Sequence, residues 1–238
     1  MTDVAELWSY LSAAPLTWLT ATLLAYIAAD AAAKRLENAP WANPVLFSVL
    51  LIAPVLWGTE TAYATYFEGA QFIHFLLGPA TVALALPLWD NRETILASVA
   101  PIALALIVGS VVAAGSVIIM ARLAGLPEAV LLSLAPKSTT APVALGIAEA
   151  VGGIPTLTAV LVILTGIIGA VTVTPLMNLL RITDWRARGF SVGVASHGIG
   201  TARAFQVNPV AGAYAGIAMA LNALLTSFIV PLLVRWLL

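Results

Sequence analysis

Long apolar segments recur along the whole chain, and six of them contain at least 18 residues. A helix that crosses a membrane needs about 20 mostly apolar residues. Only 9% of the 238 residues are charged, whereas a soluble domain carries roughly 25% charged residues. The sequence therefore predicts an all-α, polytopic integral membrane protein with about six full spans. These spans are residues 16–33, 45–67, 72–89, 95–121, 157–180 and 210–234.

The same composition excludes several classes of function. The net charge is -1 and no basic run is present, so nucleic acid is not expected as a partner. The chain has no Cys and two His, which argues against a metal centre, and we expect no cofactor. Ser196 and His197 are adjacent, so their side chains diverge, and no carboxylate lies near them in the sequence. We therefore expect no catalytic residues and no enzyme.

Two further segments are apolar but interrupted by polar residues. The first covers residues 126–151. Its apolar part Leu126–Ala135 is too short to span a membrane and ends at Pro136. The polar residues Lys137–Thr140 follow, and the next apolar part, Val143–Val151, is also too short to span. This pattern predicts two half-helices around a polar tip, in a segment that enters the membrane and returns.

The second interrupted segment covers residues 189–209, with the break at Ser196–Gly200. Its charge pattern leaves open whether it crosses the membrane or re-enters. Non-helical backbone is tolerated at membrane depth only where protein or a water-filled cavity surrounds it. Both breaks should therefore face the interior of the protein.

Basic residues predict the orientation, because cytoplasmic loops collect Lys and Arg. Lys34 and Arg35 follow the first helix, and the loop at 181–188 holds three Arg. The N-terminus is therefore predicted to lie outside, in a multi-pass protein of the bacterial plasma membrane.

We expect a single membrane domain over 1–238, divided into an N-terminal helix and loop (1–43), a first half (44–125) and a second half (126–238). A shift of 57 residues pairs Pro79 with Pro136 and Gly109 with Gly166, which fits two related halves. Two GxxxG patterns, at Gly189–Gly193 and Gly212–Gly216, predict close helix packing or a dimer contact. A homo-oligomer, most simply a dimer, is the expected assembly.

The two breaks hold the candidate binding residues, because polar groups inside a membrane are rare and usually functional. A helix that begins near Thr140 would direct its positive end toward an anion. The glycines allow close approach of a ligand, His197 titrates near neutrality, and Arg203 suits a carboxylate. The alternative is that Lys137 and Arg203 reach lipid headgroups. The candidate substrate-binding residues are Lys137, Ser138, Thr139, Thr140, Ser196, His197, Gly198, Gly200, Thr201 and Arg203.

At these residues the sequence resembles the LrgB/CidB family. The resemblance rests on LAPKSTTAPVALGIAEAVGG from Leu134 to Gly153 and ASHGIGTARAF from Ala195 to Phe205, supported by GPATVALALPLW from Gly78 to Trp89. It covers roughly residues 40 to 238.

The resemblance implies two different functions. One is a holin-like or antiholin-like modulator of murein hydrolase export and autolysis, which acts with a small LrgA/CidA-type membrane partner. The other is transport, since plastid relatives resemble glycolate and glycerate exchangers and bacterial relatives are linked to pyruvate uptake. Two positioned breaks suit the binding of a small carboxylate better than a lesion-forming pore. We therefore predict a secondary transporter of small organic anions, with the holin-like function as the alternative.

Overall fold

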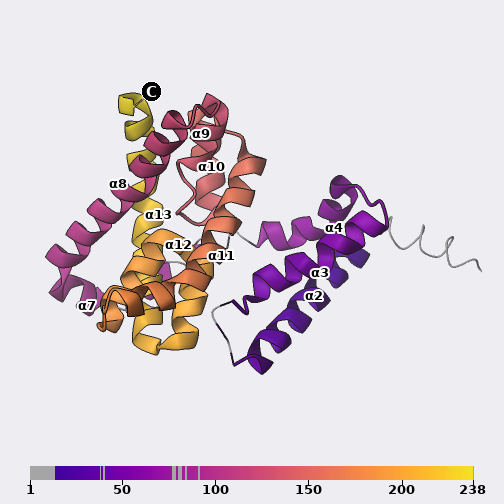
Figure 1. Cartoon of the computed structure of the whole chain (residues 1–238), viewed down its shortest axis with the longest axis horizontal. Coiled ribbons are helices and arrows are strands. Elements are labelled where there is room, and N and C mark those ends of the chain that lie inside the picture. The colour runs from indigo at the N-terminus through magenta and orange to yellow at the C-terminus, as the bar shows by residue number, and fades with distance from the viewer. Residues whose placement is uncertain are drawn as a thin grey trace, which may run out of the picture. The chain divides into compact units, whose positions relative to one another are not determined.

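The computed structural model describes residues 14–37, 39, 41–76, 79, 82–83, 85–90 and 92–237, and these form helices joined by turns, without a strand among them (Figure 1). The chain forms two compact units, Met1–Ala80 and Thr81–Leu238. We describe each unit by itself.

In the part of unit 1 that the structure describes, the helices are α2 (Pro15–Arg35), α3 (Pro44–Gly58) and α4 (Tyr63–Phe75). Helix α3 begins after Asn43, whose side chain accepts hydrogen bonds from the backbone N–H groups of Val45 and Leu46. It ends where the Thr59 hydroxyl donates to the Val55 carbonyl at 2.7 Å and Glu60 takes a positive φ of 51°. The predicted single span over 45–67 is therefore wrong, because a polar turn divides it into α3 and the start of α4.

The predicted span over 72–89 is also divided. Helix α4 already ends at Phe75, and the short helix α6 begins at Ala85. Most of the residues between them lie outside the described part of the chain, as does much of the GPATVALALPLW segment. Within the described residues, four helices are long and apolar enough to cross a membrane: α2, α8 (Val99–Leu123), α11 (Pro155–Leu179) and α13 (Pro209–Leu237).

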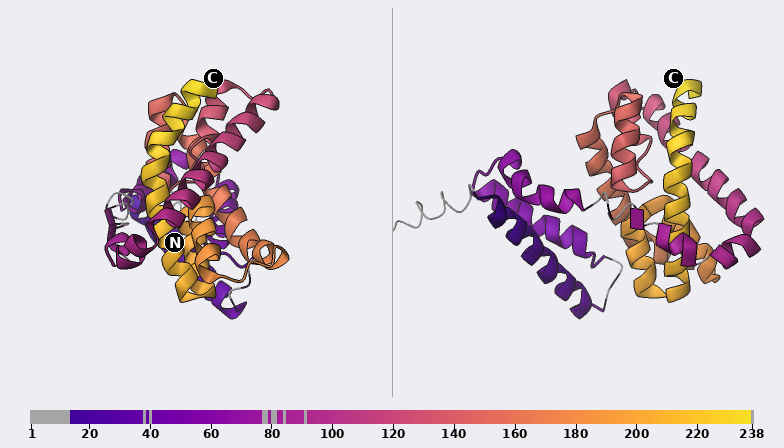
Figure 2. Two further views of the ribbon diagram at one scale, coloured as in Figure 1. Left: turned by 90° about the vertical axis from the view of Figure 1, so that its left-hand side faces the viewer. Right: turned by 180° about the vertical axis from the view of Figure 1, so that it is seen from behind.

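Unit 2 carries the interrupted segments. Its described helices are α6 (Ala85–Asp90), α7 (Arg92–Ala97), α8, α9 (Glu128–Leu134), α10 (Ala141–Val151), α11, α12 (Trp185–Val207) and α13. Helix α13 runs the length of the unit (Figure 2). At the end near the C-terminus, Ile118 of α8 packs with Leu131 of α9, Ile147 of α10 and Val230 of α13. At the other end Ile102 of α8 packs with residues of α12 and α13.

The first interrupted segment has the predicted form. Helices α9 and α10 are separated by the non-helical residues Ala135–Thr140, and Thr140 is the N-cap of α10. The Ser133 hydroxyl accepts a hydrogen bond from the Ile154 N–H at 2.8 Å, and Gly152 ends α10 with a φ of 88°. The pair α9–α10 therefore enters from the end that holds the C-terminus and returns to it. We call this pair hairpin 1.

Helix α12 also folds back on itself. Its backbone leaves helical geometry at Ser196 (φ -133°, ψ 17°) and His197 (φ 41°, ψ -135°). A Cβ atom on Gly200 would lie 2.8 Å from Val192 Cγ2, although these residues would be about 12 Å apart along a straight helix. Trp185, at the start of α12, lines the same small cavity as Val207, at its end. The second segment therefore re-enters, which settles the alternative that the sequence left open. We call it hairpin 2.

Hairpin 2 packs on the first half of α13, at the end of the unit opposite to hairpin 1. Gly189 and Gly193 lie against the backbone of Ala211 and Ala215, and Gly212 lies against the ring of Phe205. The close packing predicted from the two GxxxG patterns is thus confirmed within the chain. The two hairpins enter from opposite ends and their tips meet near the middle of α13.

A spacing of about 57 residues relates these elements. Helices α8, α9 and α10 begin at 99, 128 and 141, while α11 and the two arms of α12 begin at 155, 185 and 198. Helices α8 and α11 run in opposite directions, so the two groups form an inverted repeat. The spacing agrees with the shift found in the sequence, and the pair Gly109–Gly166 lies on α8 and α11. Pro136 lies in hairpin 1, whose counterpart by this spacing is hairpin 2, so the pairing of Pro79 with Pro136 is not part of this repeat.

Basic turns lie at both ends of unit 2. Ile95, beside the Arg92 turn, packs with Phe190 of hairpin 2, so this turn and the 181–188 loop lie at one end of unit 2. Arg122 lies at the other end, where its guanidinium donates to the carbonyl of Leu237. The Arg92 turn therefore shares an end of unit 2 with the 181–188 loop, which is predicted to be cytoplasmic.

Candidate functional site

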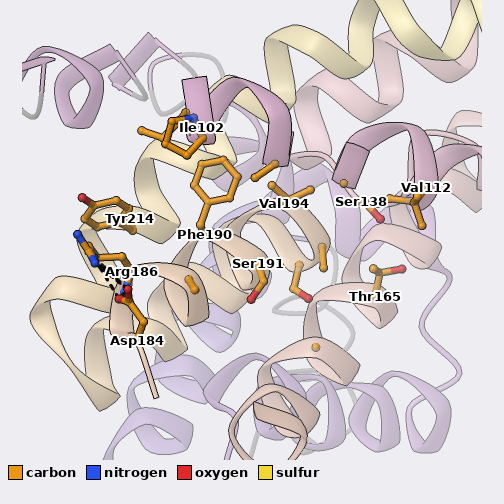
Figure 3. A pocket seen from close by; sticks show the side chains of 18 of the residues that line it. Ile102, Val112, Ser138, Thr165, Asp184, Arg186, Phe190, Ser191, Val194 and Tyr214 are labelled. Atoms are coloured by element: carbon orange, nitrogen blue, oxygen red, sulfur yellow. Dashed lines mark hydrogen bonds and ion pairs between the residues drawn. The ribbon is translucent and has the colours of Figure 1, made fainter. Parts of the chain in front are cut away.

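A cavity of about 980 Å³ lies between α8, α11 and hairpin 2. Its lining extends from the exposed pair Asp184 and Arg186 to the buried Ser196 at the tip of hairpin 2. The 12 residues from Trp185 to Ser196 span about 18 Å, somewhat more than half of a hydrocarbon core of about 30 Å. In Figure 3, Asp184, Arg186 and Tyr214 lie at one side of the cavity, and Ser138, Thr165 and Val112 lie at the other.

Lys137 and Ser138 bring the tip of hairpin 1 to the cavity. The Lys137 ammonium donates to the Ser138 hydroxyl at 3.3 Å. Among the described residues, no carboxylate forms an ion pair with Lys137. A half-buried ammonium without a protein counter-ion is suited to an anion from outside the chain.

The next two hydroxyls of hairpin 1 are buried behind this wall. Thr139 is 1% exposed and Thr140 is 9% exposed. Neither Oγ1 atom has a hydrogen-bond partner in the described part of the chain. Buried hydroxyls normally find a partner, so these two atoms are available to a ligand or to another arrangement of the helices.

The tip of hairpin 2 is tightly packed on α11. His197 is 4% exposed, and its Nε2 atom lies 2.9 Å from the carbonyl oxygen of Val162. A carbonyl only accepts, so Nε2 must carry the proton and donate it. The Thr201 hydroxyl donates to the His197 carbonyl at 2.8 Å and closes the turn.

Two glycines of α11 make this contact possible. A Cβ atom on Gly166 would lie 2.7 Å from His197 Cε1, and one on Gly169 would overlap the Ser196 hydroxyl. A larger residue at either position would displace the tip. The sequence places GIIG at 166–169 inside an apolar span, but nothing local identifies what it contacts.

Asn222 of α13 joins the two tips. Its Nδ2 group donates to the carbonyls of Ser138, at 3.1 Å, and Val194, at 3.2 Å. Its Oδ1 atom accepts from the hydroxyls of Ser110, at 2.6 Å, and Thr226, at 3.1 Å. Asn222 is 1% exposed and uses both donors and both acceptor positions. It therefore holds hairpin 1, hairpin 2 and α8 at one point near the middle of α13.

The ten predicted site residues are not all at the cavity. Lys137, Ser138 and Ser196 line it, whereas Thr139, Thr140, His197, Gly200 and Thr201 are buried in the tips, and Gly198 is exposed away from it. Arg203 lies beside Trp185 and Arg188 in a separate small cavity, and its Nη1 atom donates to the Gln206 side chain at 3.4 Å. The structure thus brings the centres of the two motifs together but leaves Arg203 apart from the cavity.

The mouth of the cavity carries charges that the prediction did not include. Asp184 caps α12 by accepting from the Arg186 N–H at 2.8 Å, and its carboxylate pairs with the Arg186 guanidinium at 2.8 Å. These hydrogen bonds lower the pKa of the Asp184 carboxyl to about 2. Asp184 therefore stays ionised at physiological pH, and its charge is balanced by Arg186. The sequence signal that could have identified Asp184 is an Asp directly before the start of a helix.

Comparison of the sequence with models of protein families identifies the family to which the chain belongs. The model of the LrgB-like family matches residues 22–236. The chain belongs to this family. The match covers both hairpins, α8, α11 and α13, so the architecture of unit 2 lies inside the LrgB-like region.

Curated LrgB-like relatives resemble the chain over most of its length. An uncharacterized protein of Bacillus subtilis, YxaC, is 37% identical over 91% of this chain and 93% of its own. The holin-like protein CidB of Staphylococcus aureus is 33% identical over 85% of this chain and 90% of its own. No solved structure matches the chain. The CidB name favours the holin-like alternative over the carboxylate transporter, and neither name mentions a solute.

Sequence reasoning missed the residues that join the hairpins to the helices. Asn222, Ser110 and Thr226 are buried polar residues in otherwise mostly apolar helices. Asn222 is the only amide in the predicted span 210–234, and a polar residue inside a span is itself a functional signal. That signal could have found it.

Proposed function

We propose that the cavity of unit 2 binds a small organic anion and that the protein carries this anion across the bacterial plasma membrane as a secondary transporter. The observation that carries the proposal is Lys137: a half-buried ammonium lines a cavity near the middle of the membrane and has no ion pair among the described residues. The volume of about 980 Å³ accommodates a small solute with water. Ser138 and Ser196 supply hydroxyls beside the charge.

The architecture supports the same proposal. Inverted repeats with broken helices that meet at mid-membrane are a common plan of secondary transporters. The N-terminus of α10 lies at the tip of hairpin 1, so its free N–H groups add positive potential there. Monocarboxylates of the size of glycolate, glycerate and pyruvate are the class we propose. The solute is moved without chemical change, and the N-terminus lies outside.

Flux into proteoliposomes tests this proposal. We expect saturable uptake of a labelled monocarboxylate, with competition among glycolate, glycerate, lactate and pyruvate. Lys137→Met keeps the length of the side chain and removes its charge. Two charges 4 Å apart interact with about 4 kcal/mol at an effective dielectric constant near 20, so we expect the KM to rise more than tenfold.

Lys34→Met is the matched control, because Lys34 pairs with Asp30 on the exposed surface of α2. Its flux should equal that of the unaltered protein. The proposal fails if no monocarboxylate is taken up, or if Lys137→Met and Lys34→Met give the same KM.

The second candidate is the holin-like function, which the names of the Staphylococcus relatives favour. In this case the protein permeabilises the membrane or regulates murein hydrolase export, as an oligomer or with a small LrgA/CidA-type partner. Leak of unrelated solutes without saturation or competition would favour it. The same proteoliposomes, loaded with a neutral dye, therefore separate the two candidates.

A further inference from the structure

The inverted repeat allows the two halves of unit 2 to be compared position by position. Subtracting 57 from a residue of α11 or hairpin 2 gives its counterpart in α8 or hairpin 1. By this rule Thr140 corresponds to His197, Ala105 to Val162, and Gly109 to Gly166. In a symmetric molecule these corresponding residues would make the same contacts.

The observed contacts are not symmetric. The tip of hairpin 2 is docked on α11, with His197 on the Val162 carbonyl and against Gly166. On the other half, Ala105 and Gly109 line the cavity instead. Helix α10 packs on α9, α11 and α13, and the Thr140 hydroxyl has no partner in the described part of the chain. The cavity thus occupies the place where hairpin 1 would dock on α8.

We infer that the protein has a second conformation in which the tip of hairpin 1 is docked on α8 and the tip of hairpin 2 is released from α11. Hairpin 1 then docks on α8, with the Thr140 hydroxyl donating to the Ala105 carbonyl and the tip close to Gly109. Hairpin 2 leaves α11, so that Val162 and Gly166 line a new cavity that opens at the opposite end of unit 2. The inference deepens the proposed transport, on which its biological meaning rests.

Among the residues of α8, Gly109 is the one that permits close docking of hairpin 1. Gly109 offers the same lack of a side chain as Gly166, and among the described residues a Cβ atom added to it would meet only Val194. Val112 stands where α11 has Gly169, so the tip of hairpin 1 must approach α8 at Gly109 and not at Val112. Thr139 and Thr140, the two buried threonines of hairpin 1, belong to the tip that would make this contact.

Single cysteines test the inference directly, since the chain has none of its own. Ala105→Cys lines the present cavity, Val162→Cys is buried with 1% exposure, and Ile118→Cys is buried in the core of the unit with 0% exposure. A membrane-impermeant thiol reagent is added to one side of sealed vesicles at a time. No solute is needed for this measurement.

We expect Ala105→Cys to react from the side of the 181–188 loop and Val162→Cys to react from the opposite side. Because a minor conformation is commonly about 0.1–10% populated, Val162→Cys should react about 10 to 1,000 times more slowly than Ala105→Cys. Ile118→Cys should be protected from both sides. The inference is overturned if Val162→Cys is protected from both sides, reacts from the loop side, or reacts no faster than Ile118→Cys.

Disulfide trapping provides a second measurement, so the test does not rest on whether a single cysteine variant folds. In Ala105→Cys/Thr140→Cys, oxidation should form an intramolecular disulfide, and the trapped protein should lose flux that reduction restores. Absence of this disulfide overturns the inference. Labelling as expected without flux would contradict the proposed transport alone, whereas flux with Val162→Cys always protected would contradict the second conformation alone.

Discussion

Hairpin 1 and hairpin 2 both carry a polar tip to the middle of α13, but only the tip of hairpin 2 is packed against the helix that precedes it. Gly166 and Gly169 of α11 allow Ser196 and His197 to touch the helix backbone. Helix α8 has Gly109 and Val112 at the corresponding positions, and there the cavity remains. The difference indicates that small residues in the preceding helix decide whether the tip of a hairpin can pack against the backbone of that helix.

The largest effect is expected from removing the anchor that both hairpins share. Asn222→Leu leaves the Ser138 and Val194 carbonyls and the Ser110 and Thr226 hydroxyls without their partner. Each buried polar group left unsatisfied costs about 1–3 kcal/mol, so the free energy of unfolding should fall by at least about 3 kcal/mol. Thermal unfolding in detergent measures this change.

Asn178→Leu is the matched control for Asn222→Leu. Asn178 is exposed near the end of α11 and accepts one hydrogen bond, from Arg188 at 2.7 Å. Its replacement should change the melting temperature much less. Equal losses in the two variants would contradict the role of Asn222 as the shared anchor.

An intermediate effect is expected when only the docked tip is disturbed. The added methyl group of Gly169→Ala would overlap the Ser196 hydroxyl, and overpacking of this kind costs typically about 1–3 kcal/mol. Gly115→Ala, in α8, has open space around the new atom and should leave stability unchanged or raise it by up to about 1 kcal/mol. Unfolding of both variants in parallel checks the pair, and a similar loss in both would refute the docking argument.

The smallest effect is expected at the start of hairpin 2, where Asp184 pairs with Arg186 on the surface. The pKa of the Asp184 carboxyl is lowered to about 2 in the folded protein, so its contribution is complete above the ordinary pKa of about 3.9. That contribution is lost only as the pH falls through about 2. The melting temperature should therefore respond equally to pH in the unaltered protein and in Asp184→Asn between pH 5 and pH 8, and a difference in this range would contradict the assignment.

The breaks themselves could be predicted from the sequence, because Pro136, the polar run after it and the Ser196–Gly200 stretch interrupt long apolar segments. The return of hairpin 2 to the end from which it enters could not be predicted. The residues that follow it carry too little charge to indicate on which side of the membrane they lie. The division at Thr59–Glu60 was missed because the flanking residues are apolar enough to be counted as one span. Contacts such as Asn222 to Ser138 join residues 84 positions apart, and no local pattern encodes such a pair.

The four hydrogen bonds of Asn222 also limit which positions of the sequence can vary among relatives. Two of its four bonds go to main-chain carbonyls, at Ser138 and Val194, and any amino acid provides a carbonyl. Positions 138 and 194 are therefore free of this constraint in their side chains, while position 222 must present a carboxamide on a short stem. Substitutions can accumulate at the two tips without altering their attachment, so the surface that the hairpins present to the cavity can change while the frame that carries them is retained.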